Sequence, residues 1–578
     1  MDGGEPDGQG PGCCGGTAMS VHSTMTGGQA LAAQLAAEGV DLIFGVPGVQ
    51  LDHAIDGLAR LDGRIAFRTV RHEQAASYMA DGYARTSDRV GVCMVVPGPG
   101  LLNAAAGIAT AYACSSRVLV LAGQLPSLAI GRGAGLLHEI PDQSRLLASL
   151  TKWSTLVRSP VDVPGAIRQA IHELRSGRPQ PVGVEIPPDV LAAEAPVEIV
   201  DPPAEDGDLL APNDKQVAEV AGLLREAERP VLLVGGGVLA AGASEELRRV
   251  AEAAGAVVVM TRNGRGALSD RHPNAVGPLG VNPLLAEADT VLVVGSRFVL
   301  HSGHQPQVTP EATTVVVNAD AADLARVKGA RLLVLADARA FLSALAAELP
   351  PPGGQAGWAV AAAREVRVRA GDHLAALEPQ MAFLGALRSA IPDHGVLVNE
   401  LTQVGYVAGL AYPVWEPRTF ITPGYQGTLG YGFPTALGVQ AADPNRPVVS
   451  ITGDGGFGWA LQELATARRY NLGVTTVVFN NNAFANVQRT QIEEFDGRVF
   501  GSDLTNPDFL ALAEAFGVPG VRAQRPSELA GALAEALTDP GPVLVEVPLG
   551  TVPSPWTLIQ QGMPVAEPTG SSSGGAFP

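Results

Sequence analysis

The sequence is poor in charged residues, in aromatic residues and in cysteine. Basic residues are the minority, because 39 Lys and Arg stand against 58 Asp and Glu, which gives a net charge of -19 over 578 residues. Polyanions repel such a chain, so we expect no nucleic-acid partner and no binding to anionic lipid. Its apolar runs, such as residues 90–96 and 257–260, have strand length and fall far short of the ~18 residues of a membrane helix. The composition therefore indicates a soluble protein with no membrane partner.

Only four cysteines are present. Cys13 and Cys14 are adjacent near the start, whereas Cys93 and Cys114 lie in apolar segments, a pattern typical of the reducing cytosol. Residues 1–22 are Gly-rich and acidic and lack the basic start and apolar stretch of a signal peptide. We predict that they form a disordered leader and that the protein is cytoplasmic.

Apolar segments of strand length alternate with helical patterns along most of the chain, which is the rhythm of parallel α/β layers. Two stretches without this periodicity, residues 192–214 and 350–356, are rich in Pro and read as linkers. At ~150 residues per domain, the length allows three or four domains. We predict three doubly wound α/β domains with parallel sheets, over residues 23–191, 215–349 and 375–550, followed by a tail over residues 551–578.

A glycine-rich turn in the third part is the most informative segment. A buried strand over residues 448–452 runs into Gly453, Asp454 and Gly455, and a helix follows. Phosphates bind at such turns, because glycine lets the backbone approach and the start of a helix offers free N–H donors. The turn therefore predicts a phosphate-bearing ligand.

The next strand decides between a dinucleotide and a metal-bound diphosphate. Residues 453–458 also fit G-x-G-x-x-G, but a dinucleotide site needs an acidic residue after the following strand, and residues 474–479 end instead in Asn480, Asn481 and Asn482. Carboxylate, amide and main-chain oxygens suit a hard divalent cation that shares its shell with phosphates. Ends of parallel strands lie side by side, so Asp454 and Asn481 can meet around one ion. The alternative is two turns without a ligand.

The spacing of these residues carries a family resemblance. Gly-Asp-Gly at 453–455 is followed by residues 456–479 and then by Asn480 and Asn481. The pattern resembles the signature of thiamin diphosphate enzymes, and residues 27–548 resemble the acetolactate synthase-like branch of that family. The resemblance implies a pyrimidine-binding domain, a central Rossmann-like domain and a diphosphate-binding domain, with thiamin diphosphate and Mg²⁺ as cofactors. It also implies at least a homodimer, or a homotetramer, because the family builds its site between two subunits.

The resemblance assigns roles to single residues. It implies that Gly453, Gly455 and Gly456 shape the diphosphate turn, and that Asp454, the Asn481 side chain and the Ala483 carbonyl hold Mg²⁺. Glu73 opens a predicted helix, where a carboxylate is normally a solvated first-turn charge. The family has at that place a glutamate that bonds the cofactor pyrimidine N1′ and promotes loss of the thiazolium C2 proton, so Glu73 is the predicted catalytic residue.

Gly427 and Leu429 match the stretch where a glycine carbonyl accepts from N4′ and a bulky apolar side chain wedges the cofactor into a bent shape. The alternative for Leu429 is an ordinary core leucine. Val49, Gln50 and Gln124 match loops that line the substrate pocket, although either glutamine could instead satisfy loop backbone. Gly235–Gly237 follow a strand and could cradle the pyrophosphate of FAD or only close a turn, so a flavoprotein remains open.

Some positions depart from acetolactate synthase. His301 stands where the family has a carboxylate-binding arginine, Thr490 stands where a tryptophan narrows the acceptor site, and Leu137-His138-Glu139 replaces the usual run. Without an arginine that binds a carboxylate through two hydrogen bonds, the site should select less strongly for a keto-acid acceptor. His301 and His304 are spaced like a metal pair but lack further ligands, and G-x-S-x-G at 570–574 has no strand before it, so neither indicates a site.

These features predict a lyase or transferase that decarboxylates a small 2-oxo acid, ligates a carbonyl acceptor to the product, or does both, in the manner of acetolactate synthase. An alternative is a C–C lyase or oxidase that acts on another carbonyl substrate. A noncatalytic binding homologue is a further alternative, disfavoured because Glu73, Asp454 and Asn481 are all present. The last alternative is a nicotinamide dehydrogenase that binds its dinucleotide at Gly453–Gly458.

Overall fold

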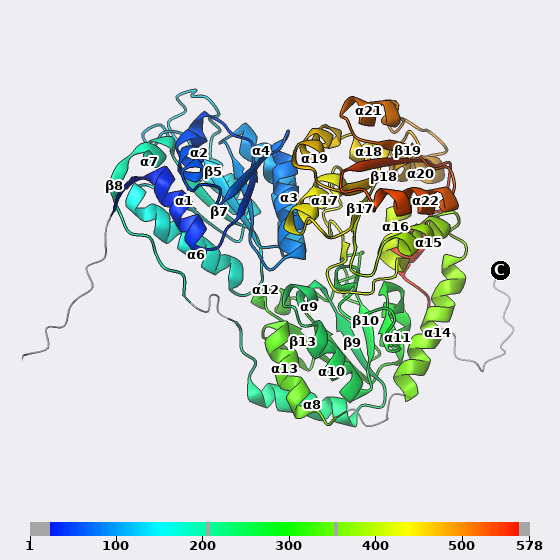
Figure 1. Ribbon diagram of the computed structural model, residues 1–578. Helices are drawn as coiled ribbons and strands as arrows, with labels where there is room; N and C mark the ends of the chain where they lie inside the picture. Colours follow the sequence, from blue (N-terminus) through cyan, green and yellow to red (C-terminus); the bar gives the residue numbers. More distant parts are fainter. Residues whose placement is uncertain (1–22, 204–208, 352–356, 566–578) are drawn as a thin grey trace, which may run out of the picture.

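The computed structural model describes residues 23–203, 209–351 and 357–565. They form three α/β domains, each with a six-stranded sheet whose neighbouring strands pair in parallel. Figure 1 shows the first domain (blue and cyan) beside the third (yellow to red), with the central domain in green beneath them. The predicted fold class is therefore confirmed. The predicted leader, and residues 566–578 of the predicted tail, lie outside the described residues.

The first domain has the strand order β3-β2-β4-β5-β7-β6. The antiparallel strands β1 (Ser23–Thr26) and β8 (Glu194–Val197) form a separate two-stranded sheet, so the stretch that we read as the first linker contains a strand. The strands of the main sheet are β2 (Leu42–Gly45), β3 (Ala66–Thr69), β4 (Gly91–Val95), β5 (Val118–Gly123), β6 (Trp153–Leu156) and β7 (Val182–Ile186). The helices are α1 (Gly27–Ala37), α2 (Asp52–Ala59), α3 (Glu73–Thr86), α4 (Pro99–Cys114), α5 (Gln143–Leu150), α6 (Val163–Arg175) and α7 (Pro188–Ala192).

The central domain has the order β11-β10-β9-β12-β13-β14. Its middle strands are buried apolar runs, as parallel strands covered on both faces must be. The strands are β9 (Pro230–Val234), β10 (Val257–Met260), β11 (Ala275–Val276), β12 (Thr290–Val294), β13 (Thr313–Asn318) and β14 (Leu332–Leu335). The helices are α8 (Asp214–Glu226), α9 (Gly236–Ala240), α10 (Ser244–Ala254), α11 (Val281–Glu287), α12 (Ala321–Leu324) and α13 (Ala338–Glu348).

The third domain has the order β16-β15-β17-β18-β20-β19. Strand β16 lies on one side of β15 and β17 on the other, so the order of the strands switches sides at β15. Ligands of open α/β sheets bind at such a switch point, beyond the carboxyl ends of the strands. The strands are β15 (Val396–Asn399), β16 (Phe420–Ile421), β17 (Val448–Gly453), β18 (Val474–Asn480), β19 (Gly520–Arg522) and β20 (Val543–Pro548). Helix α14 (Gly357–Leu374) follows the central domain and packs against it. The helices of the third domain are α15 (Gln380–Ala390), α16 (Gln403–Ala411), α17 (Gly432–Ala442), α18 (Asp454–Phe457), α19 (Leu464–Tyr470), α20 (Ala485–Glu494), α21 (Phe509–Ala515) and α22 (Pro526–Ala536), and α23 (Trp556–Gln561) follows in the predicted tail.

Helices α3 and α17 pack together and join the first domain to the third (Figure 1). Glycine permits the close approach, because a Cβ on Gly82 would lie 2.2 Å from the Thr435 carbonyl oxygen and one on Gly438 would lie 2.0 Å from that of Met79. One buried apolar cluster runs across this contact. The contact fixes the start of α3, at Glu73, relative to the turn that precedes α17.

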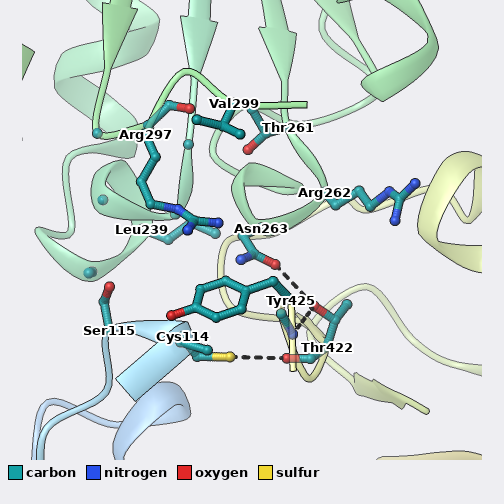
Figure 2. A pocket seen from close by; sticks show the side chains of 18 of the residues that line it. Cys114, Ser115, Leu239, Thr261, Arg262, Asn263, Arg297, Val299, Thr422 and Tyr425 are labelled. Carbon is teal, nitrogen blue, oxygen red and sulfur yellow. Dashed lines mark hydrogen bonds between the residues drawn. The ribbon is translucent and has the colours of Figure 1, made fainter. Parts of the chain in front are cut away.

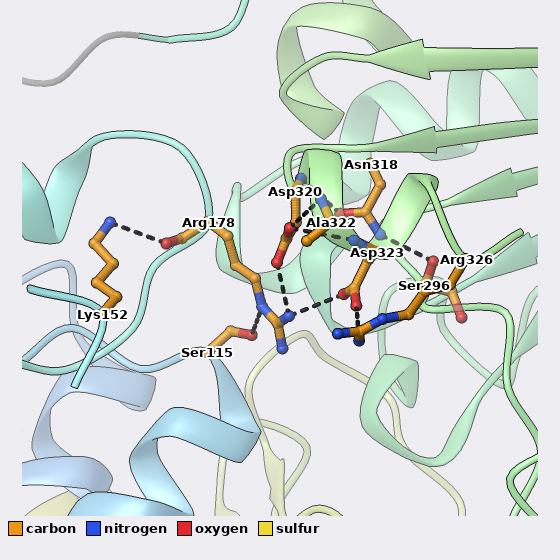
Figure 3. A network of polar contacts seen from close by, with 9 residues as sticks. All are labelled: Ser115, Lys152, Arg178, Ser296, Asn318, Asp320, Ala322, Asp323 and Arg326. Atoms are coloured by element: carbon orange, nitrogen blue, oxygen red, sulfur yellow. Dashed lines mark hydrogen bonds and ion pairs between the residues drawn. The ribbon is translucent and has the colours of Figure 1, made fainter. Parts of the chain in front are cut away.

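An ion-pair network joins the first domain to the central one (Figure 3). The Arg178 guanidinium lies 3.1 Å from Asp320 and 2.9 Å from Asp323, and it also donates to the Ser115 hydroxyl at 3.0 Å. The three charged side chains are at most 22% exposed, so water screens them little. Arg326 reaches Asp323 from the outside and is 77% exposed.

The predicted tail contains structure. Helix α23 lies within residues 551–565, its Ile559 is buried, and the Asn282 side chain of the central domain donates to the Gln561 carbonyl at 2.7 Å. This segment therefore packs against the central domain. Within the described residues, no helix is both long enough and apolar enough to cross a membrane.

Candidate active site

Asp454 and the asparagines lie together at the carboxyl edge of the third sheet. Strand β17 ends at Gly453 and β18 ends at Asn480, and Gly453 pairs in register with Phe479. Asp454, the first residue of α18, is 3% exposed. Burial raises the pKa of Asp454, while hydrogen bonds from Asn506 and from main-chain N–H groups act in the opposite direction. The neighbouring strand ends that the sequence predicted are therefore present.

The sequence did not predict the asparagine at the centre of this edge. The Asn506 side-chain nitrogen lies 2.7 Å from Asp454 Oδ2, 3.0 Å from Asn480 Oδ1 and 3.1 Å from Asn482 Oδ1. Two amide hydrogens cannot satisfy the lone pairs of three oxygens. Hard oxygen ligands with spare lone pairs therefore gather where the resemblance places Mg²⁺.

A cavity of about 380 Å³ opens at this cluster. It is lined by Asp454, Gly455, Gly458, Trp459, Phe484, Leu504 and Asn506. Half-buried Asn481 follows β18, and Ala483 forms a bridge with Asp503, which returns the chain toward Asn506. The donors present, one carboxylate and several amide and carbonyl oxygens, fit a magnesium-bound diphosphate. The described residues contain no group of three His, Cys, Asp or Glu side chains that would offer another metal site.

The glycines of this turn serve different purposes. A Cβ at Gly455 would lie 2.6 Å from the Phe484 ring, and one at Gly456 would lie 2.0 Å from the Glu400 carboxyl. Gly453 has more room, since its nearest neighbour, Thr402, is 3.6 Å away. Two of the three glycines are thus required by neighbouring side chains.

Glu73 is the first residue of α3 and is half-buried. The His72 side chain caps the helix by accepting from the Gln74 N–H at 3.1 Å. Glu73 Oε2 accepts from Asn103 Nδ2 at 3.0 Å, a partner on α4 that the sequence did not reveal. The carboxylate is therefore held by one donor and belongs to neither of the two cavities described here, at Asp454 and between the domains.

The turn before α17 carries Gly427 and Leu429. Gly427 has φ +58°, which favours glycine, and a Cβ there would also lie 2.9 Å from Leu401. Leu429 is 37% exposed, so it is not an ordinary core leucine. Thr428 Oγ1 lies 2.5 Å from the Tyr78 hydroxyl of α3. The contact between Thr428 and Tyr78 holds this turn, and the turn keeps the apolar Leu429 side chain exposed. Such a side chain is suited to pack against a ligand.

A buried glutamate ties the residues before Glu73 to the third domain. Glu463 is fully buried, and its two carboxylate oxygens accept from the Arg71 N–H at 3.1 and 3.2 Å. Thr466 Oγ1 donates to it at 2.5 Å. Burial raises the pKa of Glu463 to about 7 against these hydrogen bonds. Glu463 therefore positions the entry into α3.

A larger cavity, of about 590 Å³, lies where the three domains meet. Figure 2 shows Cys114 and Ser115 of the first domain, Asn263 and Arg297 of the central domain, and Thr422 and Tyr425 of the third around it. The Arg297 guanidinium stacks 4.4 Å from the centre of the Tyr425 ring. The lining extends from Gly235–Gly237 to Gly427. A Cβ at Gly235 or Gly237 would lie 2.3 or 2.7 Å from atoms of Gly295, so close packing of two turns accounts for these two glycines.

His301 and Trp556 form part of the wall of this cavity. Their rings are 5.8 Å apart, Tyr406 lies 5.2 Å from Trp556 on another side, and the Arg489 guanidinium is 5.8 Å from the Trp556 ring. Partial burial and the charge of Arg262 lower the pKa of His301, so its imidazole is neutral at pH 7. Trp556, which we placed in the tail, is thus a site residue that the sequence did not indicate.

Thr490 follows Arg489 on α20, and its hydroxyl is engaged locally, by the Asn486 carbonyl at 3.3 Å and by Arg489 Nη2 at 3.2 Å. Thr490 therefore does not supply the aromatic ring that a tryptophan would provide at this position. The cavity nonetheless has a tryptophan in its wall, Trp556, whose ring lies beside the Arg489 guanidinium.

The remaining pocket candidates lie in the first domain and line neither of these two cavities. Val49 is 64% exposed. Gln50 is buried, and its Oε1 has no hydrogen-bond partner among the described residues. Gln124 accepts from the Leu125 N–H at 2.7 Å and donates to Glu185 at 2.9 Å, so it satisfies its own loop. Of the two glutamines, Gln50 is therefore the one with a side-chain acceptor left unpaired among the described residues.

Comparison with known proteins assigns the three domains. Residues 25–146 match the N-terminal TPP binding domain of thiamine pyrophosphate enzymes, residues 217–345 match their central domain, and residues 401–547 match their C-terminal TPP binding domain. The chain belongs to the thiamine pyrophosphate enzymes. It is therefore a thiamin diphosphate-dependent enzyme of the acetolactate synthase-like type.

Three relatives align along nearly their whole length. The probable 2-ketoarginine decarboxylase AruI of Pseudomonas aeruginosa is 35% identical, over 92% of this chain and 95% of its own. The probable acetolactate synthase large subunit of Methanocaldococcus jannaschii is 34% identical, over 90% and 92%. The acetolactate synthase isozyme 3 large subunit of Escherichia coli is 33% identical, over 89% and 92%. Decarboxylases and synthases are thus similarly close.

Proposed function

We propose that this thiamine pyrophosphate enzyme uses Mg²⁺ to decarboxylate a 2-oxo acid, to ligate the product to a carbonyl acceptor, or to do both. The observation that carries the proposal is the group of oxygens around Asn506, from Asp454, Asn480 and Asn482, at the switch point of the third sheet. Similarity to a probable decarboxylase supports the first reaction, and similarity to an acetolactate synthase subunit supports the second. An oxidase or a C–C lyase that acts on another carbonyl remains the alternative.

The chain's own residues divide the work. Asp454, the Asn481 side chain and the Ala483 carbonyl would hold Mg²⁺, which neutralises a diphosphate beside a buried carboxylate. Bound thiamin diphosphate supplies an electron sink at its thiazolium ring. Glu73 holds and moves the proton at the pyrimidine nitrogen, and Leu429 fixes the bend of the cofactor.

We further propose a homodimer, or a homotetramer built from such dimers, in which the first domain of one subunit completes the third-domain site of another. In support, Glu73 and Gln50 lie in the first domain and line neither the cavity at Asp454 nor the larger cavity between the domains. Among residues 23–203, 209–351 and 357–565, the Glu73 carboxylate has one hydrogen-bond donor, Asn103, which binds Oε2 and leaves Oε1 available.

The proposed substrate site lies along the His301 and Trp556 wall. A neutral imidazole makes one bond to a carboxylate where guanidinium makes two. Arg262 lines the same cavity and the Arg489 guanidinium lies beside Trp556, so positive charge near this wall disfavours a cationic substrate side chain. The proposal is therefore a small 2-oxo acid donor with an uncharged aldehyde as acceptor, or with no acceptor. The products formed from pyruvate with and without an added aldehyde test it.

A flavin dinucleotide is the proposed ligand of the 590 Å³ cavity. The volume and the cationic Arg297 on Tyr425 support this proposal. The glycines at 235 and 237 do not add to it, because Gly295 already requires them. The absorbance spectrum of the purified protein and mass analysis of released cofactor test it, and a protein without bound flavin would leave the cavity to another ligand.

A further inference from the structure

Glu400 is a buried carboxylate at the switch point of the third sheet. It follows β15 directly and is 2% exposed. Its two oxygens accept three hydrogen bonds, from the Gly430 N–H at 2.9 Å, the Gly432 N–H at 2.8 Å and Thr452 Oγ1 at 3.0 Å. Buried carboxylates are costly unless they are satisfied in this way.

The donors come from two turns with different proposed tasks. Gly430 and Gly432 end the turn that carries Gly427 and Leu429, which we call the wedge turn (residues 427–432). Thr452 lies in β17 and directly precedes the diphosphate turn, residues 453–456. The Glu400 side chain therefore links the wedge turn to the residue that precedes the diphosphate turn.

The space for this carboxylate is made by missing side chains. A Cβ at Gly456, in the diphosphate turn, would lie 2.0 Å from Glu400 Oε1, and one at Gly432 would lie 2.9 Å from Oε2. A Cβ at Gly405 would lie 2.0 Å from the Glu400 carbonyl oxygen. Both turns are thus shaped to receive this residue.

Burial and hydrogen bonding act in opposite directions on the charge of Glu400. Burial raises the pKa of Glu400 to about 7, and the three hydrogen bonds oppose that shift. The charged form can accept from all three donors at once, whereas the amide of a glutamine presents N–H groups to at least one of them.

We propose that Glu400 is a positioning residue that holds the wedge turn in register with the diphosphate turn. Leu429 then stays at a fixed place relative to the anchored end of the cofactor. The inference rests on the proposed function, since the roles of both turns come from it. Misplacement of an orienting group by about 1 Å can slow a reaction ~10²-fold, so a tie of this kind has a measurable effect.

The test measures exchange of the cofactor C2 proton by NMR in protein loaded with Mg²⁺ and thiamin diphosphate. Variants are Glu400→Gln, Leu429→Ala and the double variant. Glu246→Gln is the matched control, because Glu246 is also a buried glutamate with a hydrogen-bond partner, Arg339 at 3.2 Å, but lies in the central domain. Calorimetry gives cofactor affinity for each protein.

We expect Glu400→Gln to slow exchange ~30-fold or more while cofactor affinity falls far less, because the diphosphate anchor remains. The double variant should be no slower than Leu429→Ala, since Glu400 acts through the wedge turn. Glu246→Gln should exchange like the wild type. Wild-type exchange in Glu400→Gln, or losses that multiply in the double variant, would overturn the inference.

Thr452→Val keeps the carboxylate and removes one of its donors, so it serves if Glu400→Gln does not fold. We expect a loss of ~10-fold that again does not multiply with Leu429→Ala. Wild-type exchange in Thr452→Val would overturn the inference, and so would a double variant with Leu429→Ala in which the two losses multiply. If the wild type itself failed to bind thiamin diphosphate with Mg²⁺, the proposed function would fall first, and this outcome is separate from the others.

Discussion

Gln74, the residue after Glu73, donates its side-chain amide to the main-chain carbonyl of Leu429 at 3.4 Å. The predicted catalytic helix and the predicted wedge of the cofactor are therefore in contact within one chain. Glu73 itself nevertheless lies outside the cavity at Asp454. In the proposed dimer, each subunit ties its own Leu429 to the helix whose glutamate serves the site of its partner.

Hybrid oligomers test this arrangement. Glu73→Gln and Asp454→Ala should each be inactive alone. In a mixed dimer, one site carries both changes and the other carries neither, so refolding or coexpressing equal amounts should restore about a quarter of wild-type activity by random pairing. Turnover of a 2-oxo acid by the mixture measures it. A mixture as inactive as its components would place both residues in one subunit's site.

Glu73→Gln leaves a hydrogen-bonding group but removes the exchangeable acid. Cofactor should still bind, while exchange of its C2 proton slows by ~10² or more. NMR of the bound cofactor follows the exchange. The matched variant Glu194→Gln changes an exposed glutamate on β8 of the first domain, and it should exchange at the wild-type rate. Unchanged exchange in Glu73→Gln would reduce Glu73 to a helix-capping charge.

His301 should set the preference among acceptors. With neutral His301, we expect acetolactate to be a minor product from pyruvate, and better turnover with an uncharged aldehyde acceptor. His301→Arg restores a fork of donors and should raise the acetolactate share several-fold, about as one charged hydrogen bond allows. His304→Arg adds the same charge three residues away and serves as control. Acetolactate as the dominant wild-type product would contradict the assignment.

Arg178 should stabilise the contact between the first and central domains. Arg178→Ala leaves Asp323 buried with less compensation, so we expect a loss of about 2 kcal/mol in the free energy of unfolding. Arg326→Ala removes an exposed partner of the same aspartate and should cost less than about 0.5 kcal/mol. Denaturant titration of both variants compares them, and equal losses would show that burial of the network does not matter.

Alternation of strands and helices allowed the sequence to predict the sheet edge that holds Asp454. Residues 448–452 and 474–479 are apolar runs of strand length, and neighbouring parallel strands bring their carboxyl ends together. Their residue types alone then indicated oxygen ligands. That part of the site follows from periodicity and spacing.

The other partners leave no periodic signal. Asn506 reaches the cluster through a loop held by the single bridge between Ala483 and Asp503, and Glu400 looks in sequence like any acid after a strand. Helix α23 is only six residues long and lies between a proline and a glycine, a pattern typical of a loop. Each gains its meaning from contacts with residues distant in the chain, which local patterns do not encode.

Titration of the wild type and of Asp454→Ala with thiamin diphosphate, in Mg²⁺ and in EDTA, tests the central claim most directly. Diphosphate and a buried carboxylate repel each other without a cation between them. We therefore expect the wild type to bind in Mg²⁺ but not in EDTA, and Asp454→Ala to bind in neither. The control Asp508→Ala, which removes a carboxylate that caps α21, should bind in Mg²⁺ like the wild type. Unchanged affinity in EDTA or in Asp454→Ala would contradict a metal-bridged diphosphate site at Asp454.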